Sequence, residues 1–197
     1  MTTDITVLPG APERWPDVET LMAGHGERGC WCQYWRLTSS EYSARGLGGG
    51  PRLLRAQLES SPAPGLLAYV EGRPVGWCGI GPRTSMGRLV RSRTIPRIDD
   101  RPVWSIVCFL VRVGYRRHGV AAALLAGVVD YAVKQGAVGL EAYPIDPEGA
   151  RVDVAFAYVG TTSMFERAGF RRVVETASRS AGRTRWLMRL DLDRPAS

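Results

Sequence analysis

The sequence predicts an α/β fold in which helices cover both faces of a mixed sheet. Residues 103–145 read as an apolar strand, a helix and a second strand in succession, which is the order of a βαβ unit with two roughly parallel strands. Residues 65–82 and 171–192 each read as two strands joined by a short turn, the pattern of an antiparallel hairpin. Together these three units predict a mixed sheet.

The composition supports a single globular domain. The chain has 197 residues, of which 45% are hydrophobic and 23% are charged, as in ordinary globular proteins. The sequence contains no run of about 18 apolar residues, so no membrane span is expected. The N-terminus lacks the basic and apolar regions of a signal peptide. We therefore expect a cytoplasmic protein with no membrane partner.

The net charge of +7 comes almost entirely from arginine, because Lys134 is the only lysine. Such a balance suits either nucleic acid or a small polyanionic cofactor. The basic residues are spread along the chain, and the sequence has neither a helix-turn-helix signal nor the aromatic and basic strands of an RRM. We therefore do not expect a nucleic-acid partner.

The first third of the chain reads as one strand and two helices around an irregular segment. A strand is predicted over residues 5–8 and a helix over residues 13–22. Residues 24–42 are dense in glycine and aromatic residues, which favours an irregular loop. After the triple glycine 48–50, a second helix is predicted over residues 51–60, where Ser-Pro-Ala-Pro ends it.

The middle of the chain carries the first hairpin and the central strand. Strands are predicted over residues 65–72 and 74–82, with a turn signal at residues 71–73. Residues 83–102 are polar and rich in arginine, so we expect a long connection at the rim of the sheet. Residues 103–113 form a continuous apolar run, which fits a central strand covered on both faces.

The last part of the chain alternates between helices and strands. Apolar residues at helical spacing predict a helix over residues 120–135, which Gly136 ends. A strand is predicted over residues 138–145, followed by a second long loop. A short helix over residues 161–168 precedes the terminal hairpin, which turns at residues 180–182.

The helix that begins at Val120 lacks the Ser, Thr, Asp or Asn that normally bonds the first free N–H groups of a helix. Arg116, Arg117, His118 and Gly119 precede it, and they add cations where the helix dipole is already positive. A bound diphosphate accounts for both features, because it accepts the free N–H groups and neutralises the cations. Glycine at the junction lets the backbone approach such a ligand closely. The glycine patterns of P-loop and dinucleotide-binding proteins are absent.

Residues 116–121 have the form R-x-x-G-x-A, which resembles the acetyl-CoA pyrophosphate loop of the GNAT superfamily of N-acetyltransferases. The order of elements is also similar to that of the family, from the hairpin over residues 65–81 to the late helix and the Gly-Phe pair at 169–170. The resemblance covers residues 65–192. It implies the GNAT fold, whose mixed, mostly antiparallel sheet has one pair of parallel strands that splay apart. It also implies one domain, in which residues 1–64 supply early helices and an acceptor-side segment and the remainder binds acetyl-CoA.

The resemblance implies acetyl-CoA as the co-substrate and no metal. Backbone groups at the end of the central strand would bond the pantetheine arm and stabilise the developing oxyanion. N–H groups at the start of the following helix would hold the pyrophosphate. The cofactor-binding residues implied in this way are Phe109, Leu110, Val111, Arg116, Arg117, His118, Gly119, Val120, Ala121 and Ala122.

The sequence offers several candidates for the groups that move protons. Many family members carry a tyrosine acid four residues before the glycine of Gly-Phe, but Phe165 stands there. Glu141 is the first candidate for the base, since a carboxylate in an apolar strand requires a reason; the alternative is a salt bridge to an arginine. Tyr143 lies two residues further on the same face and is a candidate for the acid. Other candidates are Cys108, Tyr158 and Ser163 for the acid, Asp99, Asp100 and Asp146 for the base, and water. The alternative is that the thiolate leaves without an acid.

The aromatic segment is expected on the acceptor side. Trp31, Tyr34 and Trp35 form either an aromatic wall for an apolar, planar or cationic acceptor or part of the core. We expect transfer of an acetyl group to a primary amine of a small molecule or protein. The alternative is a protein of the same fold that binds CoA but has lost or changed catalysis. Family members often form dimers, so a homodimer is a candidate assembly.

The four cysteines do not predict a metal site. Cys30, Cys32 and His25 are close in sequence, but a zinc site usually needs a second pair of ligands. Cys78 and Cys108 lie in apolar, strand-like runs, so we expect both to be buried free thiols.

Overall fold

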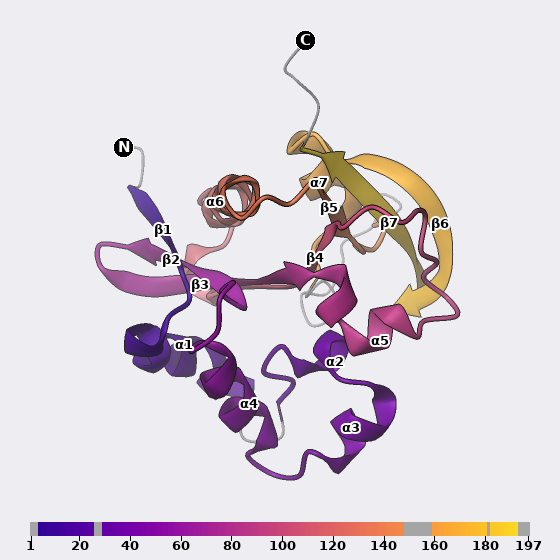
Figure 1. Cartoon of the computed structure of the whole chain (residues 1–197). Coiled ribbons are helices and arrows are strands. Elements are labelled where there is room, and N and C mark those ends of the chain that lie inside the picture. The colour runs from indigo at the N-terminus through magenta and orange to yellow at the C-terminus, as the bar shows by residue number, and fades with distance from the viewer. Residues whose placement is uncertain (1–3, 26–28, 148–158, 181, 193–197) are drawn as a thin grey trace.

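The computed structural model describes residues 4–25, 29–147, 159–180 and 182–192. Its centre is a seven-stranded sheet with the order β1-β2-β3-β4-β5-β7-β6 (Figure 1). All neighbouring strands are antiparallel except β4 and β5, which are parallel. The strands are β1 Ile5–Pro9, β2 Gly65–Val70, β3 Arg73–Pro82, β4 Trp104–Val111, β5 Gly139–Ala142, β6 Arg171–Ser180 and β7 Arg183–Asp191.

Helices cover both faces of this sheet, as the sequence predicts (Figure 1). The α-helices are α1 Trp15–Met22, α2 Gln33–Arg36, α3 Ser39–Ala44, α4 Gly49–Gln57, α5 Gly87–Val90, α6 Val120–Lys134 and α7 Thr162–Arg167. In the described part of the chain, no helix is both long and apolar enough to cross a lipid bilayer.

Two parts of the sequence prediction need correction. Residues 24–42 are not simply an irregular loop, because they contain α2 and the start of α3. The α3 helix begins with a capping box in which the Thr38 hydroxyl accepts from the Glu41 N–H and the Glu41 carboxylate accepts from the Thr38 N–H. The second predicted helix begins at Gly49, inside the triple glycine, rather than at Pro51.

The core alternates between the two faces of the sheet. On β2, Leu66 and Ala68 pack with the buried face of α6, whereas Leu67 packs with α1 and α4. On β4, Phe109 faces the α6 side and Cys108 faces the side of the early helices. This alternation follows from the two-residue period of a strand, and it confirms the predicted fold class.

The parallel pair separates after only three residue pairs, of which Ile106 and Ala142 form the last. A β-bulge lies at the same place, because β3 pairs Gly79 with Cys108 and Ile80 with Ile106, so that Val107 is the extra residue. From Val107 onward, the edge of β4 that faced β5 has no strand partner in the described structure. The strands therefore splay as the family resemblance implies.

Candidate active site

A cavity of about 1490 Å³ lies along the part of β4 that has left β5. It is larger than the roughly 300–1,000 Å³ of a typical ligand pocket, so it has room for two substrates. Residues 107–117 line it together with residues of α1 and of the segment 30–35. The cavity therefore joins the predicted cofactor-binding strand to the predicted acceptor segment.

The start of α6 lies at the end of this cavity. Gly119 adopts a φ of 83°, in the left-handed region that favours glycine. No side chain caps the helix, and its first backbone bond runs from the Ala123 N–H to the Gly119 carbonyl at 2.9 Å. The N–H groups of residues 120–122 therefore have no acceptor within the helix. This geometry is that of an anion-binding helix start.

The predicted cofactor-binding residues gather at this end of the cavity. Those that line it are Phe109, Leu110, Val111, Arg116, Arg117 and Ala121. The others belong to the same helix start without forming part of the wall: His118, Gly119, Val120 and Ala122.

Arginines supply the charged side chains that line the cavity among the described residues: Arg73, Arg112, Arg116 and Arg117. The sequence does not identify Arg73, because only the pairing of Gly76 with Val111 brings the start of β3 to this end of β4. The Arg116 Nε donates to the Val111 carbonyl at 3.1 Å and folds the loop back onto the strand. Guanidinium groups match the geometry of phosphate oxygens.

The aromatic residues of the early segment line the opposite part of the cavity and also belong to the core. Trp31 stacks on Trp15 with 5.9 Å between ring centroids. Tyr34 meets Trp35 edge to face at 5.1 Å, and Trp35 is also 6.1 Å from Tyr143. Trp31, Tyr34 and Trp35 all line the cavity, so they are not core residues alone, and their contact with an acceptor stays a prediction.

Glu141 and Tyr143 lie side by side on the β5 segment but do not line the cavity. Glu141 is only 1% exposed. It accepts from Arg83 Nε at 3.2 Å, from Arg189 Nη2 at 2.7 Å and from the Tyr143 hydroxyl at 2.9 Å. Burial, followed by the charge of Glu141, raises the pKa of Tyr143. Glu141 therefore forms the salt bridges to arginine that the sequence analysis gives as its alternative role. Proton transfer by Glu141 and Tyr143 stays a prediction.

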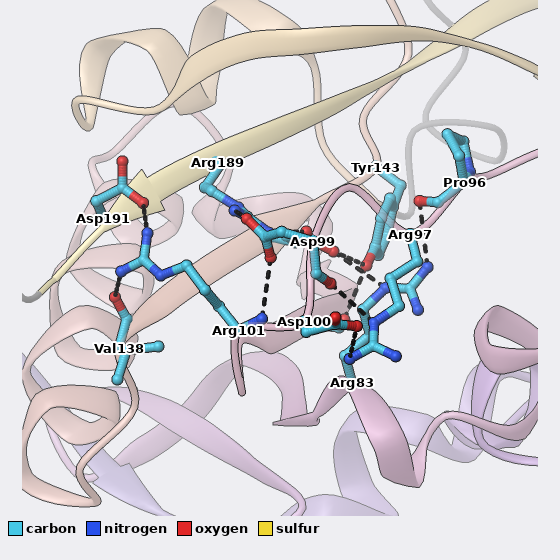
Figure 2. Close-up of polar contacts among 12 residues, drawn as sticks. Arg83, Pro96, Arg97, Asp99, Asp100, Arg101, Val138, Tyr143, Arg189 and Asp191 are labelled. Carbon is cyan, nitrogen blue, oxygen red and sulfur yellow. Dashed lines mark hydrogen bonds and ion pairs between the residues drawn. The ribbon is translucent and has the colours of Figure 1, made fainter.

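The same buried network anchors the long connection before β4. Arg189 also pairs with Asp99, and its guanidinium lowers the pKa of that carboxyl group. Arg101 donates to the Asp191 carboxylate at 2.6 Å and to the Val138 carbonyl at 3.1 Å (Figure 2). The connection is therefore fixed against β5 and β7 beside the site.

The other predicted proton carriers are mostly engaged elsewhere. Asp100 pairs with Arg97, Asp146 pairs with Arg172, and the Ser163 hydroxyl lies 3.2 Å from that of Thr161. None of the described residues Asp99, Asp100, Asp146 and Ser163 lines the cavity, whereas Cys108 does. Tyr158 lies outside the described residues.

Phe165, at the position of the family's tyrosine acid, is fully buried. Its ring contacts Phe109 at 5.9 Å and Phe170 at 5.1 Å, both edge to face. The position is thus part of the core between α7 and the sheet, and it offers no proton.

The cysteines differ from the prediction in one respect. Cys78 is buried, but Cys108 is only half-buried, because its side chain lies on the cavity face of β4. Cys32 is buried, and Cys30 is exposed. Within the described residues, no three His, Cys, Asp or Glu side chains come together in a way that could hold a metal ion.

Comparison with known proteins identifies the family. The model of the acetyltransferase (GNAT) family matches residues 31–149. The chain therefore belongs to the GNAT acetyltransferase family, whose members use acetyl-CoA as the acetyl donor. A search of curated proteins found no match.

Solved structures show the same fold at low sequence identity. A GNAT acetyltransferase from Streptococcus pneumoniae is 16% identical with a TM-score of 0.57, covering 96% of this chain and 99% of its own. The ribosomal-protein-S18-alanine N-acetyltransferase of Escherichia coli is 11% identical with a TM-score of 0.54, and the match covers 98% of this chain and 97% of that enzyme. YncA from Salmonella typhimurium, solved with its cofactor acetyl-CoA, is 14% identical with a TM-score of 0.53, and the match covers 98% of this chain and 96% of YncA.

Proposed function

We propose that this protein is an N-acetyltransferase that moves the acetyl group of acetyl-CoA to a primary amine of a small molecule or protein. The observation that carries the proposal is one continuous cavity, which runs from the uncapped start of α6 along the unpaired edge of β4 to an aromatic wall. In this proposal the amine attacks the thioester directly, without an acyl-enzyme.

The donor side of the site has the groups that the substrate requires. The N–H groups of residues 120–122 and the arginines at the cavity end would hold the diphosphate. Backbone groups of residues 109–111, on the strand edge that β5 leaves free, would bond the pantetheine arm. One N–H of this edge would stabilise the oxyanion that forms as the amine attacks.

The acceptor side suits an apolar or aromatic amine. Trp31, Tyr34 and Trp35 line this part of the cavity together with Leu21 and Met22 of α1. Flat aromatic faces and apolar side chains favour an acceptor that buries hydrocarbon beside its amino group.

Acetyl-CoA is expected to raise the melting temperature of the purified protein. At a concentration 100-fold above its Kd, a ligand stabilises the native state by about 2.7 kcal/mol, which corresponds to roughly 5–10 °C for a chain of this size. Acetyl-pantetheine, which lacks the diphosphate, should give a much smaller shift at the same concentration. Equal shifts for both compounds in a thermal unfolding assay would contradict the proposed diphosphate site.

A second candidate function is CoA binding without acetyl transfer, because Phe165 removes the family's usual acid from this position. The two candidate functions predict different results when acetyl-CoA is mixed with amines. Only a transferase consumes the thioester and so lowers its absorbance. A panel of 2-phenylethylamine, a lysine-containing peptide and spermidine covers aromatic, protein and polycationic acceptors. Consumption with at least one amine supports the transferase, with 2-phenylethylamine expected to be preferred, whereas binding without consumption supports the second candidate.

A further inference from the structure

A pair of cysteines from distant parts of the chain meets on the wall of the cavity. Cys32, just before α2, and Cys108, on β4, both line it. They meet above Gly79, where an added Cβ would lie 3.2 Å from both the Cys32 Sγ and the Cys108 Cβ. The sulfur of Cys32 also accepts a hydrogen bond of 2.9 Å from the Trp77 indole Nε1–H.

The surroundings of Cys32 favour its anionic form. The pKa of Cys32 is lowered, chiefly by the hydrogen bond from the Cys108 thiol. Burial raises this pKa, but the charge of Arg36 and the hydrogen bond from the Trp77 N–H lower it further. Arg36 donates its Nη2 to the carbonyls of Pro64 and Ile80, and it has no ion pair with a carboxylate among the described residues. A cation and two donors around one sulfur are the environment of a reactive thiolate.

The thiols that surround Cys32 have raised pKa values, so Cys32 is the most readily ionised of the four. The hydrogen bond to Cys32, followed by burial, raises the pKa of Cys108. Burial, followed by the charge of Cys32, raises the pKa of Cys78. The pKa of Cys30 is also raised, because partial desolvation of its sulfur and the charge of Cys32 disfavour the thiolate, although the residue as a whole is exposed. The titratable and charged groups around Cys32 in the described structure are therefore the thiols of Cys30, Cys78 and Cys108 and the guanidinium of Arg36.

The position of Cys32 fits the missing proton step. Its neighbours on the cavity wall are Trp31 and Tyr34 on the acceptor side and Cys108 beside the unpaired edge of β4. Cys32 therefore lies between the proposed acceptor pocket and the strand that is proposed to bond the pantetheine arm. Glu141, by contrast, does not line the cavity and accepts from two arginines.

We propose that the Cys32 thiolate is the general base that takes a proton from the ammonium group of the acceptor, a role that rests on the proposed acetyl transfer. The ammonium gives one proton to the sulfur, and the lone pair of the resulting amine attacks the thioester carbonyl carbon. The C–N bond forms, the C–S bond of acetyl-CoA breaks, and the second amine proton goes to the CoA thiolate. Cys32 then releases its proton to water.

Replacement of Cys32 is expected to change the pH profile as well as the rate. General bases contribute about 10²–10⁴-fold, so Cys32→Ala should lower kcat/KM for an accepted amine by at least roughly 100-fold near pH 7. The ratio of wild type to variant should fall toward one as the pH passes the pKa of the amine, because free amine then needs no base. Cys78→Ala, which removes a buried thiol that does not line the cavity, should keep the wild-type profile.

A second measurement does not depend on turnover. The ultraviolet thiolate absorbance of the wild type should titrate in part below the ordinary cysteine pKa of about 8.5, and Cys32→Ser should abolish that part. Absence of this early titration overturns the proposal even if the variants fold poorly.

Three outcomes separate the proposals. Wild-type turnover with a ratio to Cys32→Ala that does not vary with pH overturns the base role and leaves the transferase function standing. An acetyl group on Cys32 after incubation with acetyl-CoA alone, detected by mass spectrometry, overturns it in favour of an acyl-enzyme. Failure of the wild type to consume acetyl-CoA with any amine of the panel counts against the transferase function itself, and the base role fails with it.

Discussion

Gly119→Asp is expected to weaken acetyl-CoA binding by about 100-fold. The added carboxylate would lie at the helix start where we propose the diphosphate binds, and two like charges about 5 Å apart repel by roughly 3 kcal/mol at an effective dielectric constant of 20. The position has room for the side chain, because the nearest atom to an added Cβ is Ile5 Cδ1 at 3.8 Å. Aspartate also tolerates the left-handed backbone better than most residues. Isothermal titration calorimetry with acetyl-CoA measures the change.

Gly136→Asp is the matched control, at the opposite end of the same helix. Gly136 has a φ of 76°, close to the 83° of Gly119, and no atom lies within 4 Å of an added Cβ. The two variants therefore carry the same backbone strain and the same charge. An equal loss of affinity in both variants would mean that the effect does not depend on the position of the charge. That result would contradict diphosphate binding at the start of α6.

Glu141→Ala is expected to lower the free energy of unfolding by about 3–5 kcal/mol, the usual cost of removing one partner from a buried ion pair. Arg83 and Arg189, 8% and 3% exposed, would lose the carboxylate that they share. The Tyr143 hydroxyl would lose one of its two partners and keep Ser105 at 2.8 Å. Urea unfolding followed by circular dichroism measures the loss.

Glu166→Ala is the control for this substitution. Glu166 also accepts from an arginine, Arg172 Nε at 2.7 Å, but its side chain is 43% exposed. Solvent screens such a pair, so the expected loss is at most about 1 kcal/mol. Similar losses for the two variants would show that the buried network does not stabilise the fold as described.

Much of the fold could be predicted because its main signals are local. The apolar run of β4, the helical spacing of α6 and the turn between β2 and β3 each depend on neighbouring residues. The short helix α2 could not be found in this way, since it is four residues long and follows Trp31 and Cys32, which have positive φ angles. The α3 helix had a readable signal in the Thr38 and Glu41 capping box.

The candidate site could be predicted only where it follows the chain. The helix start at Gly119 and the strand before it are contiguous, so the proposed diphosphate site could be predicted from the sequence. Arg73 and the pairing of Cys32 with Cys108 depend on strand register and on the path of the early segment. The arginine partners of Glu141 come from β7 and from the connection after β3. Both are far from Glu141 in the sequence, so no local pattern predicts these ion pairs.

The most direct test of acetyl-CoA binding at the start of α6 is an NMR titration of the ¹⁵N-labelled protein. The free N–H groups of residues 120–122 and those of residues 109–111 should show the largest backbone shifts on addition of acetyl-CoA. The N–H groups near Gly136, at the far end of the helix, should stay nearly unchanged. Saturable binding that leaves the signals of residues 120–122 in place would contradict the proposed site.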